Sequence, residues 1–334
     1  MNNGNNISRQ ELDKGMFIIR SIIDYYSQKI VGQQSLVRSI LIALMANGHI
    51  LLESVPGLAK TTAAKIITNA VAGRFSRIQC TPDLLPSDII GGQIFNYSTS
   101  SFETKLGPVF ANFVLLDEIN RSSAKTQSAM LEAMQERQTT IGGVIYKLPK
   151  LFIVIATQNP VEQEGTYNLA EAQTDRFLIK EVIDYPTPQE EVEILSRLET
   201  NIFDENKQIL SITDLIFLQY LTKKVYMDQN IKRYIAEIVN VTRHPENYLP
   251  EEVYKYITMG ASTRASISFM ECGKANALLY GRTFVTPDDI KEIAYRVLRH
   301  RIALSFAAEA NGIKVENIID EILKVVPTPW EKHT

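Results

Sequence analysis

The sequence predicts an α/β domain with a doubly wound parallel sheet, followed by a smaller all-α domain. Three observations predict this fold. Short, continuously apolar runs alternate with helical or loop segments over roughly residues 30–185, as expected for parallel strands covered on both faces. One such run, residues 50–53, leads into a short loop and then a helical stretch, which is the layout of a phosphate-binding loop. Beyond Pro186 and Pro188 the apolar spacing is helical throughout.

The elements of the first domain follow from the apolar pattern. We expect a disordered polar tail over residues 1–8, then helices over residues 9–28 and 35–47, the second closed by Asn47-Gly48. Apolar runs predict five parallel strands, at residues 49–52, 74–80, 113–116, 151–157 and 178–183. Further helices are predicted at residues 61–71 and 124–136. Two β-hairpins are inserted, over residues 91–105 and, around a Gly-Gly turn, residues 138–146.

The second domain begins after the stiff segment that contains Pro186 and Pro188. Helices are predicted at residues 189–199, 212–226, 229–242, 262–280, 287–299 and 316–325. Thr286-Pro287-Asp288-Asp289 is a capping box with proline at the first helical position. The predicted core therefore spans residues 9–188 and the helical domain residues 189–334.

Composition limits the functional classes. The 334 residues include 45% hydrophobic and 22% charged residues, and the formal net charge of −3 gives no reason to expect nucleic acid or an anionic membrane as partner. Cys80 and Cys272 lie far apart, and the four histidines show no ligand spacing, so any metal should arrive with a nucleotide. A reduced, cytoplasmic compartment is the default for such cysteine usage. No apolar run approaches the ~18 residues of a membrane span.

The candidate phosphate-binding loop matches the spacing G-x-x-x-x-G-K-[ST], with Ser54 and Ala59 in place of the two glycines. Lys60 would reach the β- and γ-phosphates, and the Thr61 hydroxyl would be a ligand of Mg²⁺. The loop is completed by Pro56, Gly57, Leu58 and Thr62, and Val31 and Gly32 are further candidates for nucleotide binding. Taken alone, the stretch is equally compatible with a strand, a turn and a helix that carries a surface lysine.

Ser54 is the clearest departure from the loop pattern. A Cβ at this position opposes positive φ, which would cost about 1–2 kcal/mol and weaken phosphate binding up to roughly tenfold. If φ is negative, the substitution costs nothing.

Polar residues follow two other predicted strands. Asp117 and Glu118 end an apolar strand, where one carboxylate would hold Mg²⁺ and the other would align the attacking water. Asn159 ends the next strand and would orient that water or contact the γ-phosphate. The alternatives are a solvated acidic turn and an Asn-Pro turn.

Two arginines complete the candidate set. Arg176 precedes the last strand, and Arg264 lies in the first turn of a helix, where a cation gains nothing from the helix dipole. A guanidinium could stabilise γ-phosphate oxygens, in its own subunit or in a neighbour. Surface ion pairs are the alternative for each.

Seven motifs stand together in this chain. They are VPGLAKT at 55–61, TPDLLPSD at 81–88, GPVFAN at 107–112, LDEINR at 116–121, ATQNP at 156–160, QEGTY at 163–167 and EAQTDRF at 171–177. With these motifs the chain resembles the MoxR family of AAA+ ATPases over nearly its whole length. The resemblance implies an AAA+ P-loop NTPase core and a helical lid.

The resemblance also implies roles. Lys60 and Thr61 would form Walker A, Asp117 and Glu118 Walker B, Asn159 sensor 1 and Arg264 sensor 2, while Arg176 resembles the finger that reaches the neighbouring subunit's nucleotide. The cofactors would be ATP and Mg²⁺. Such families form rings, here a homo-hexamer, and mature or assemble other proteins. They often act with a von Willebrand factor A domain protein and sometimes insert a metal or cofactor.

Other functions stay open at this stage. With Ser54 in the loop, the protein could be a nucleotide-binding scaffold that hydrolyses ATP poorly. The cluster Arg296, Arg299, His300 and Arg301 could serve a nucleic-acid motor, although such a cluster is more often a solvated helix end. A magnesium-chelatase-like subunit is a further alternative within the ring-forming class.

Overall fold

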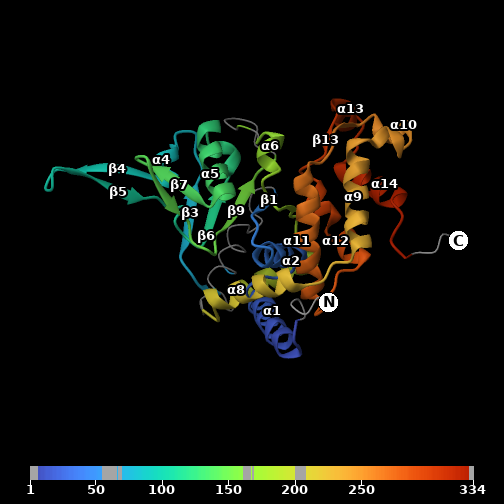
Figure 1. The fold of residues 1–334 in the computed structure, drawn as a ribbon, viewed down its shortest axis with the longest axis horizontal. Helices are drawn as coiled ribbons and strands as arrows, with labels where there is room; N and C mark the ends of the chain where they lie inside the picture. Colours follow the sequence, from blue (N-terminus) through green and yellow to red (C-terminus); the bar gives the residue numbers. More distant parts are fainter. Residues whose placement is uncertain are drawn as a thin grey trace.

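A five-stranded parallel sheet forms the centre of the first domain (Figure 1), in the order β10-β1-β9-β6-β3. The computed structural model describes residues 7–54, 66, 70–160, 167, 169–199 and 208–330. The strands are β1 (Ile50–Glu53), β3 (Phe75–Gln79), β6 (Phe113–Asp117), β9 (Ile153–Gln158) and β10 (Ile179–Val182). All five predicted strands are confirmed.

The three central strands, β1, β6 and β9, are mostly apolar because each of their faces packs on a separate core. Along β6, Phe113 and Leu115 belong to one buried cluster, whereas Val114 and Leu116 belong to the other. Side chains alternate across a strand, so a strand covered on both faces needs an apolar residue at every position.

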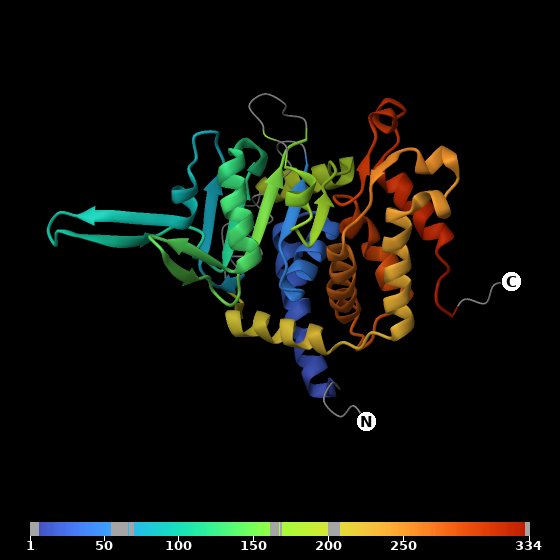
Figure 2. The ribbon, with the colours of Figure 1, turned by 45° about the horizontal axis from the view of Figure 1, so that its top comes forward.

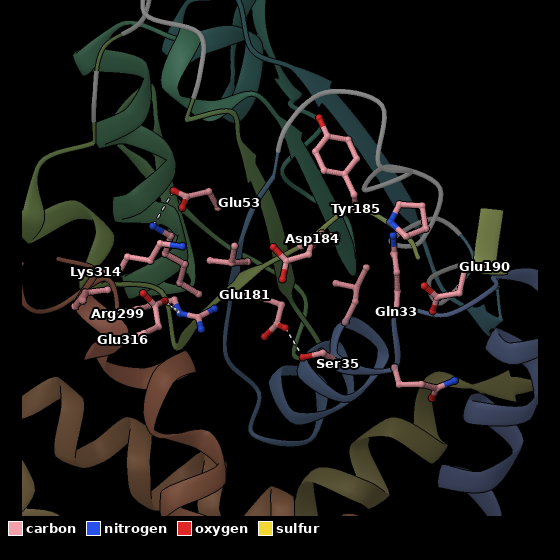
Figure 3. A pocket seen from close by; sticks show the side chains of 17 residues that line it. Gln33, Ser35, Glu53, Glu181, Asp184, Tyr185, Glu190, Arg299, Lys314 and Glu316 are labelled. Carbon is pink, nitrogen blue, oxygen red and sulfur yellow. Dashed lines mark hydrogen bonds and ion pairs between the residues drawn. The ribbon is translucent and has the colours of Figure 1, made fainter. Parts of the chain in front are cut away.

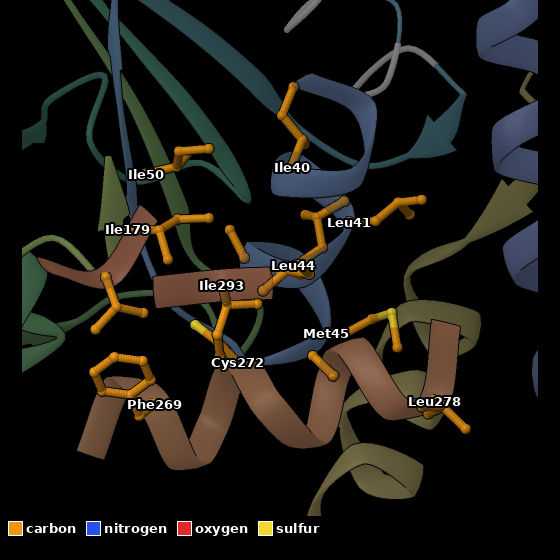
Figure 4. Close-up of a cluster of buried hydrophobic side chains, with 14 of the residues drawn as sticks. Ile40, Leu41, Leu44, Met45, Ile50, Ile179, Phe269, Cys272, Leu278 and Ile293 are labelled. Atoms are coloured by element: carbon orange, nitrogen blue, oxygen red, sulfur yellow. The ribbon is translucent and has the colours of Figure 1, made fainter. Parts of the chain in front are cut away.

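Helices supply the two covers of the sheet. α1 (Arg9–Lys29) and α2 (Gln34–Met45) contribute to the first cluster, and α5 (Ala124–Glu136) contributes to the second. The first cluster continues into the helical region, where Leu44 of α2 lies near Ile293 and Cys272 (Figure 4). Because one cluster joins residues on both sides of position 188, the exact domain boundary stays a prediction.

The helical region follows the predicted order (Figure 2). Its longer helices are α7 (Pro188–Glu199), α8 (Ile212–Lys224), α9 (Gln229–Arg243), α11 (Thr263–Leu279), α12 (Pro287–Leu298) and α14 (Val315–Val325). The capping box at α12 is confirmed, since the Thr286 N–H donates to Asp289 Oδ2 at 2.8 Å. None of the described helices combines the length and the apolar character that a bilayer span requires.

Two antiparallel hairpins are inserted in the core, as predicted. The first, β4 (Gly91–Asn96) and β5 (Ser101–Leu106), extends away from the body of the molecule (Figures 1 and 2). The second is β7 (Gln138–Ile141) and β8 (Val144–Lys147). The Tyr146 hydroxyl donates to Thr104 Oγ1 at 3.1 Å, so the two hairpins are in contact.

Several short elements carry no clear sequence pattern and were not predicted. They are β2 (Val71–Ala72), α4 (Pro86–Ile90), η1 (Ile119–Arg121), α6 (Glu171–Thr174), β11 (Leu210–Ser211), η2 (Pro245–Asn247), α10 (Glu251–Tyr254), β12 (Ile257–Met259), β13 (Ala303–Leu304) and α13 (Phe306–Ala310).

Two predicted boundaries are corrected. Val71 was placed in a helix but pairs with Leu210 as part of β2, and most of that helix (61–65 and 67–69) lies outside the described residues. Ser8 was placed in a disordered tail, of which residues 1–6 lie outside the described residues. It is the N-cap of α1, because its hydroxyl accepts from the Glu11 N–H and its own N–H donates to the Glu11 carboxylate at 2.8 Å.

His49, just before β1, is buried and neutral. The Val154 N–H donates to its Nδ1 at 3.0 Å, and its Nε2 lies 3.2 Å from the Met134 carbonyl oxygen, so the proton is on Nε2. Burial, with a smaller contribution from the charge of Arg137, lowers the pKa of His49 to about 3.

We expect His49 to make the folded state sensitive to acid. Its pKa is lower in the folded than in the unfolded chain, so its stabilising contribution is full above the unfolded pKa near 6.5 and falls as pH falls from there toward 3. Between pH 7 and pH 5 this is a loss of about 2 kcal/mol in the free energy of unfolding. Urea titrations of wild type and His49→Gln at both pH values measure it. His244→Gln, at an exposed histidine, is the control, and equal pH dependence in all three proteins would contradict the prediction.

Candidate functional site

The candidate residues on β1, β6 and β9 meet at one edge of the sheet. Glu53, the last residue of β1, pairs with Gln158 of β9, and Leu116 of β6 pairs with Ala156. Because the strands are parallel, Asp117, Glu118 and Asn159 follow at the same carboxyl edge, where ligands bind in open α/β sheets. The predicted loop residues Pro56, Gly57, Leu58, Ala59, Lys60, Thr61 and Thr62 lie outside the described residues.

Asp117 is a buried carboxylate with a cation against it. It is 3% exposed. Arg77 Nε of the neighbouring edge strand β3 donates to its Oδ2 at 2.6 Å, and the Thr157 hydroxyl lies 3.5 Å from its Oδ1. The Arg77 charge offsets part of the cost of burying the carboxylate.

Glu118 has a left-handed backbone, with φ 58° and ψ 54°. Such a conformation costs a non-glycine residue on the order of 1–3 kcal/mol and concentrates at functional sites. The Glu118 N–H donates to Thr157 Oγ1 at 2.9 Å, which holds this turn. Its Oε2 accepts from Gln79 Nε2 at 3.1 Å and Arg121 Nη1 at 3.2 Å. The carboxylate is therefore oriented by two donors, and the backbone that carries it by a third hydrogen bond.

Asn159 is buried at the end of β9, next in order to β6. Its carbonyl oxygen accepts from Asn120 Nδ2 at 3.3 Å, and the Asn120 carbonyl accepts from the Tyr167 N–H at 2.6 Å. Gln127 Nε2 in turn donates to the Tyr167 carbonyl at 3.0 Å. These bonds tie the segment after β9 to the turn that follows Glu118, which fixes Asn159 beside the two carboxylates.

The hypothesis that Ser54 strains the loop is wrong. Ser54 is not among the described non-glycine residues with positive φ, which are Gln33, Asn47, Ser100, Glu118, Arg137 and Trp330. Its N–H donates to the Gln158 carbonyl at 3.3 Å, so it extends the pairing of β1 with β9 by one residue. A strand position of this kind accepts a Cβ without penalty. The reason for expecting weak hydrolysis is therefore removed.

We accordingly expect Ser54→Gly to leave nucleotide affinity within about twofold of wild type, which is under 0.5 kcal/mol. The measurement is titration calorimetry with a non-hydrolysable ATP analogue and excess Mg²⁺. Tighter binding by several-fold would restore the strain hypothesis.

A cavity of about 720 Å³ opens beside the end of β1 (Figure 3). It is bordered by the start of α2, the carboxyl end of β10 with the segment after it, and the start of α14. Gly32 lies next to it with φ +67°, where a Cβ would come within 2.0 Å of Glu190 Oε1. Val31 is buried. The close approach of Glu190 explains why position 32 is a glycine.

Arg176 lies at the opposite edge of the sheet from the carboxylates. The Leu178 N–H donates to the His49 carbonyl at 2.8 Å, so Arg176 precedes the amino ends of β1 and β10. Along β1, four residues separate His49 from Glu53, which is about 13 Å at 3.3 Å per residue and exceeds the length of an arginine side chain.

Arg264 lies on the Arg176 side. It is in the first turn of α11, 3.3 Å from Asp175 Oδ2, and its Nη2 donates to Gln135 Oε1 at 3.4 Å. Arg176 and Arg264 border one cavity of about 150 Å³. The structure thus brings the two arginines together and separates both from Asp117, Glu118 and Asn159.

The basic cluster is neither a nucleic-acid surface nor a solvated helix end. Arg296 pairs with Glu181, Arg299 with Glu316 and Arg301 with Asp175, at 2.9, 3.2 and 2.8 Å. His300 is buried, and burial lowers its pKa well below the usual range. Arg299 joins two helices of the helical region, whereas Arg296 joins that region to β10 and Arg301 joins it to the segment before β10.

Sequence reasoning missed four residues that support the site. Arg77 and Gln79 occupy alternate positions of an edge strand, so both face Asp117 and Glu118, and this polar alternation was a readable signal. Thr157 had no signal within its apolar run. Asp175 stood next to Arg176 in the motif, but its partners come from the far end of the chain.

Comparisons with known proteins agree over nearly the whole chain. Residues 49–179 match the ATPase family associated with various cellular activities (AAA), and residues 251–322 match the AAA lid domain. The chain is 45% identical to Chaperone MoxR1 of Mycobacterium tuberculosis, over 95% of this chain and 82% of that protein. It is 43% identical to the YeaC protein of Bacillus subtilis, over 94% and 96%.

A crystal structure from Cytophaga hutchinsonii has the same fold, with a TM-score of 0.89 and 45% identity over 96% of this chain and 97% of that one. The five-stranded parallel sheet, the two inserted hairpins and the helical lid are therefore an AAA+ core and its lid. This chain belongs to the MoxR family of AAA+ ATPases.

Proposed function

We propose that this protein binds ATP with Mg²⁺, hydrolyses it as a homo-hexameric ring, and uses the reaction to mature, assemble or remodel a client protein. One observation carries the proposal: the carboxylates and the arginines lie at opposite edges of the sheet. Each subunit then has nucleotide-binding groups at one edge of its sheet and phosphate-stabilising cations at the other. A neighbour placed head to tail would bring its cations to that nucleotide and complete the site. Head-to-tail contacts form a ring when the rotation between neighbouring subunits closes.

The residues at the carboxyl edge fit a magnesium nucleotide. Lys60 and Thr61 would hold the phosphates and the metal, and the Asp117 carboxylate supplies the oxygen ligands that Mg²⁺ prefers. When bound, Mg²⁺ would neutralise charge on the β- and γ-phosphates. The acid-rich cavity beside β1, with Glu53, Glu181 and Glu190, suits the base and ribose rather than the phosphates.

Glu118 and Asn159 would act on the attacking water. The Glu118 carboxylate would accept its proton, and the buried Asn159 amide would orient it. Gln79 and Arg121 hold the same carboxylate oxygen, which restricts its rotation before substrate binds.

The chaperone role is supported by the printed name of Chaperone MoxR1 and by exposed aromatic side chains on the first hairpin. Tyr97 is 88% and Phe102 66% exposed. Apolar groups displayed in this way are typical of contact surfaces for other proteins. A von Willebrand factor A domain protein is the partner we propose, and insertion of a metal or cofactor is one form that the maturation could take.

Phosphate release measured against protein concentration tests the enzymatic part. We expect Mg²⁺-dependent hydrolysis whose specific activity rises with concentration as native mass spectrometry detects hexamers. Activity that is constant from monomer to hexamer would contradict the shared site. Affinity capture with Glu118→Gln, in ATP and in buffer without nucleotide, tests whether a client protein binds in an ATP-dependent way. An identical set of captured proteins in both conditions would contradict the client role.

A further inference from the structure

Asp175 is the point at which the core meets the lid. Its Oδ2 accepts from the Ser262 hydroxyl at 2.7 Å and from Arg264 Nη1 at 3.3 Å, and its Oδ1 accepts from Arg301 Nε at 2.8 Å. Asp175 follows α6 of the core, whereas its three partners belong to the lid. Only 12% of its side chain is exposed, so these bonds form largely out of water and are stronger for it.

Arg301 fixes the backbone on either side of the candidate finger. Its side chain is 1% exposed. Its Nη2 donates to the Phe177 carbonyl at 2.6 Å and to Ser268 Oγ at 3.0 Å, and its Nη1 donates to the Leu178 carbonyl at 3.2 Å. One buried guanidinium therefore holds both Asp175 and Phe177. Because Arg176 lies between them, its backbone has a fixed position.

Arg176 and Arg264 remain available for an anion. Arg176 Nε is buried and has no hydrogen-bond partner among the residues that the structure describes. The Arg264 side chain is 44% exposed and lies in the first turn of α11, where the helix dipole disfavours a cation. Asp175 is the negatively charged group that holds Arg264 there, beside the longer hydrogen bond to Gln135. Three arginines and one carboxylate therefore border the small cavity, and the excess positive charge faces solvent through Arg264.

We infer that Asp175 is a positioning residue, which presents Arg176 of the core and Arg264 of the lid as one pair of guanidinium groups to the phosphates of the neighbouring subunit's nucleotide. The inference rests on the proposed shared site. Two guanidinium groups from different domains offer preorganised charge only if their spacing is fixed before the phosphate arrives. The Asp175 carboxylate fixes it, since one of its oxygens binds Arg264 and the other binds the arginine that clamps Arg176.

The isosteric variant Asp175→Asn tests this. It removes the charge that holds Arg264 and Arg301 while keeping the shape. We expect kcat for ATP hydrolysis to fall by up to about 10²-fold, the cost of misplacing a group by roughly 1 Å, with KM for ATP changed less than threefold. Glu171→Gln, an exposed acid of α6 in the same segment, is the matched control and should keep wild-type kcat.

Mixed rings separate positioning from a general structural defect. Asp175→Asn mixed with Lys60→Ala should recover activity, because the Lys60→Ala subunit contributes an intact arginine edge to its neighbour's nucleotide. Arg176→Ala mixed with Lys60→Ala is the reference. If the reference recovers and Asp175→Asn does not, the inference is wrong while the shared site stands. If neither recovers in assembled rings, the shared site itself is wrong, and the inference with it.

A second variant keeps the inference testable if Asp175→Asn folds poorly. Ser262→Ala removes one hydrogen bond to Asp175 Oδ2, the oxygen that also accepts from Arg264, and leaves the Asp175–Arg301 pair in place. We expect a smaller loss of kcat, with the same recovery in mixed rings. Wild-type kcat in a folded Ser262→Ala and a folded Asp175→Asn would overturn the inference.

Discussion

Replacing Arg176 with alanine should lower ATP turnover by about 10³–10⁵-fold, the range found for arginines that stabilise phosphoryl transfer from a neighbouring protein or subunit. The physical reason is the loss of a cation that meets the γ-phosphate only as charge develops on its oxygens. Arg176 is too far from its own carboxylates to act on the same subunit. Nucleotide affinity should therefore stay close to that of wild type, because the subunit's own binding groups are untouched.

The measurement is single-turnover phosphate release, together with equilibrium binding of a fluorescent nucleotide. Arg74→Ala, at an arginine of the core that precedes β3, is a control for lost charge. Equal losses in both variants, or a collapse of nucleotide affinity in Arg176→Ala, would show that Arg176 does not act as a finger.

Replacing Glu118 with glutamine should remove most of the hydrolysis and keep nucleotide binding. A glutamine has the shape of the carboxylate and can still contact Gln79, but it cannot accept the proton of water. General-base catalysis contributes roughly 10²–10⁴-fold, so we expect turnover to fall by that factor. The ion pair with Arg121 is also lost, but it is half exposed and contributes little.

Steady-state phosphate release and ATP affinity measured on the same preparation check this expectation. Glu132→Gln, at an exposed glutamate of α5, controls for loss of one surface charge. Normal hydrolysis by Glu118→Gln would show that the base has been assigned to the wrong residue.

The parallel sheet and the helices were predictable because their patterns are local. β6 is recognisable as a run of apolar residues because both of its faces are covered, and α5 has the bounds that were predicted for it, residues 124–136. Asp117, Glu118 and Asn159 were placed at one edge for the same reason: the carboxyl ends of parallel strands meet.

The arginines could not be placed in this way. Arg264 and Arg301 take their positions from Asp175, about 90 and 126 residues away in the chain, and no local spacing encodes a pair of that kind. The four-residue basic cluster looked solvated for the same reason, since its acidic partners come from β10, α14 and the segment before β10. The backbone of Glu118 was equally hidden, because a glutamate carries no preference for positive φ.

The left-handed backbone of Glu118 brings stability and activity into conflict at a single position. Glycine takes the φ of Glu118 freely, so Glu118→Gly would release strain of order 1 kcal/mol and make the folded chain harder to melt. The same change removes the proposed base. Selection for heat resistance alone would therefore move this position toward glycine and yield a more durable but inactive protein, and only a requirement for turnover retains the strained acid.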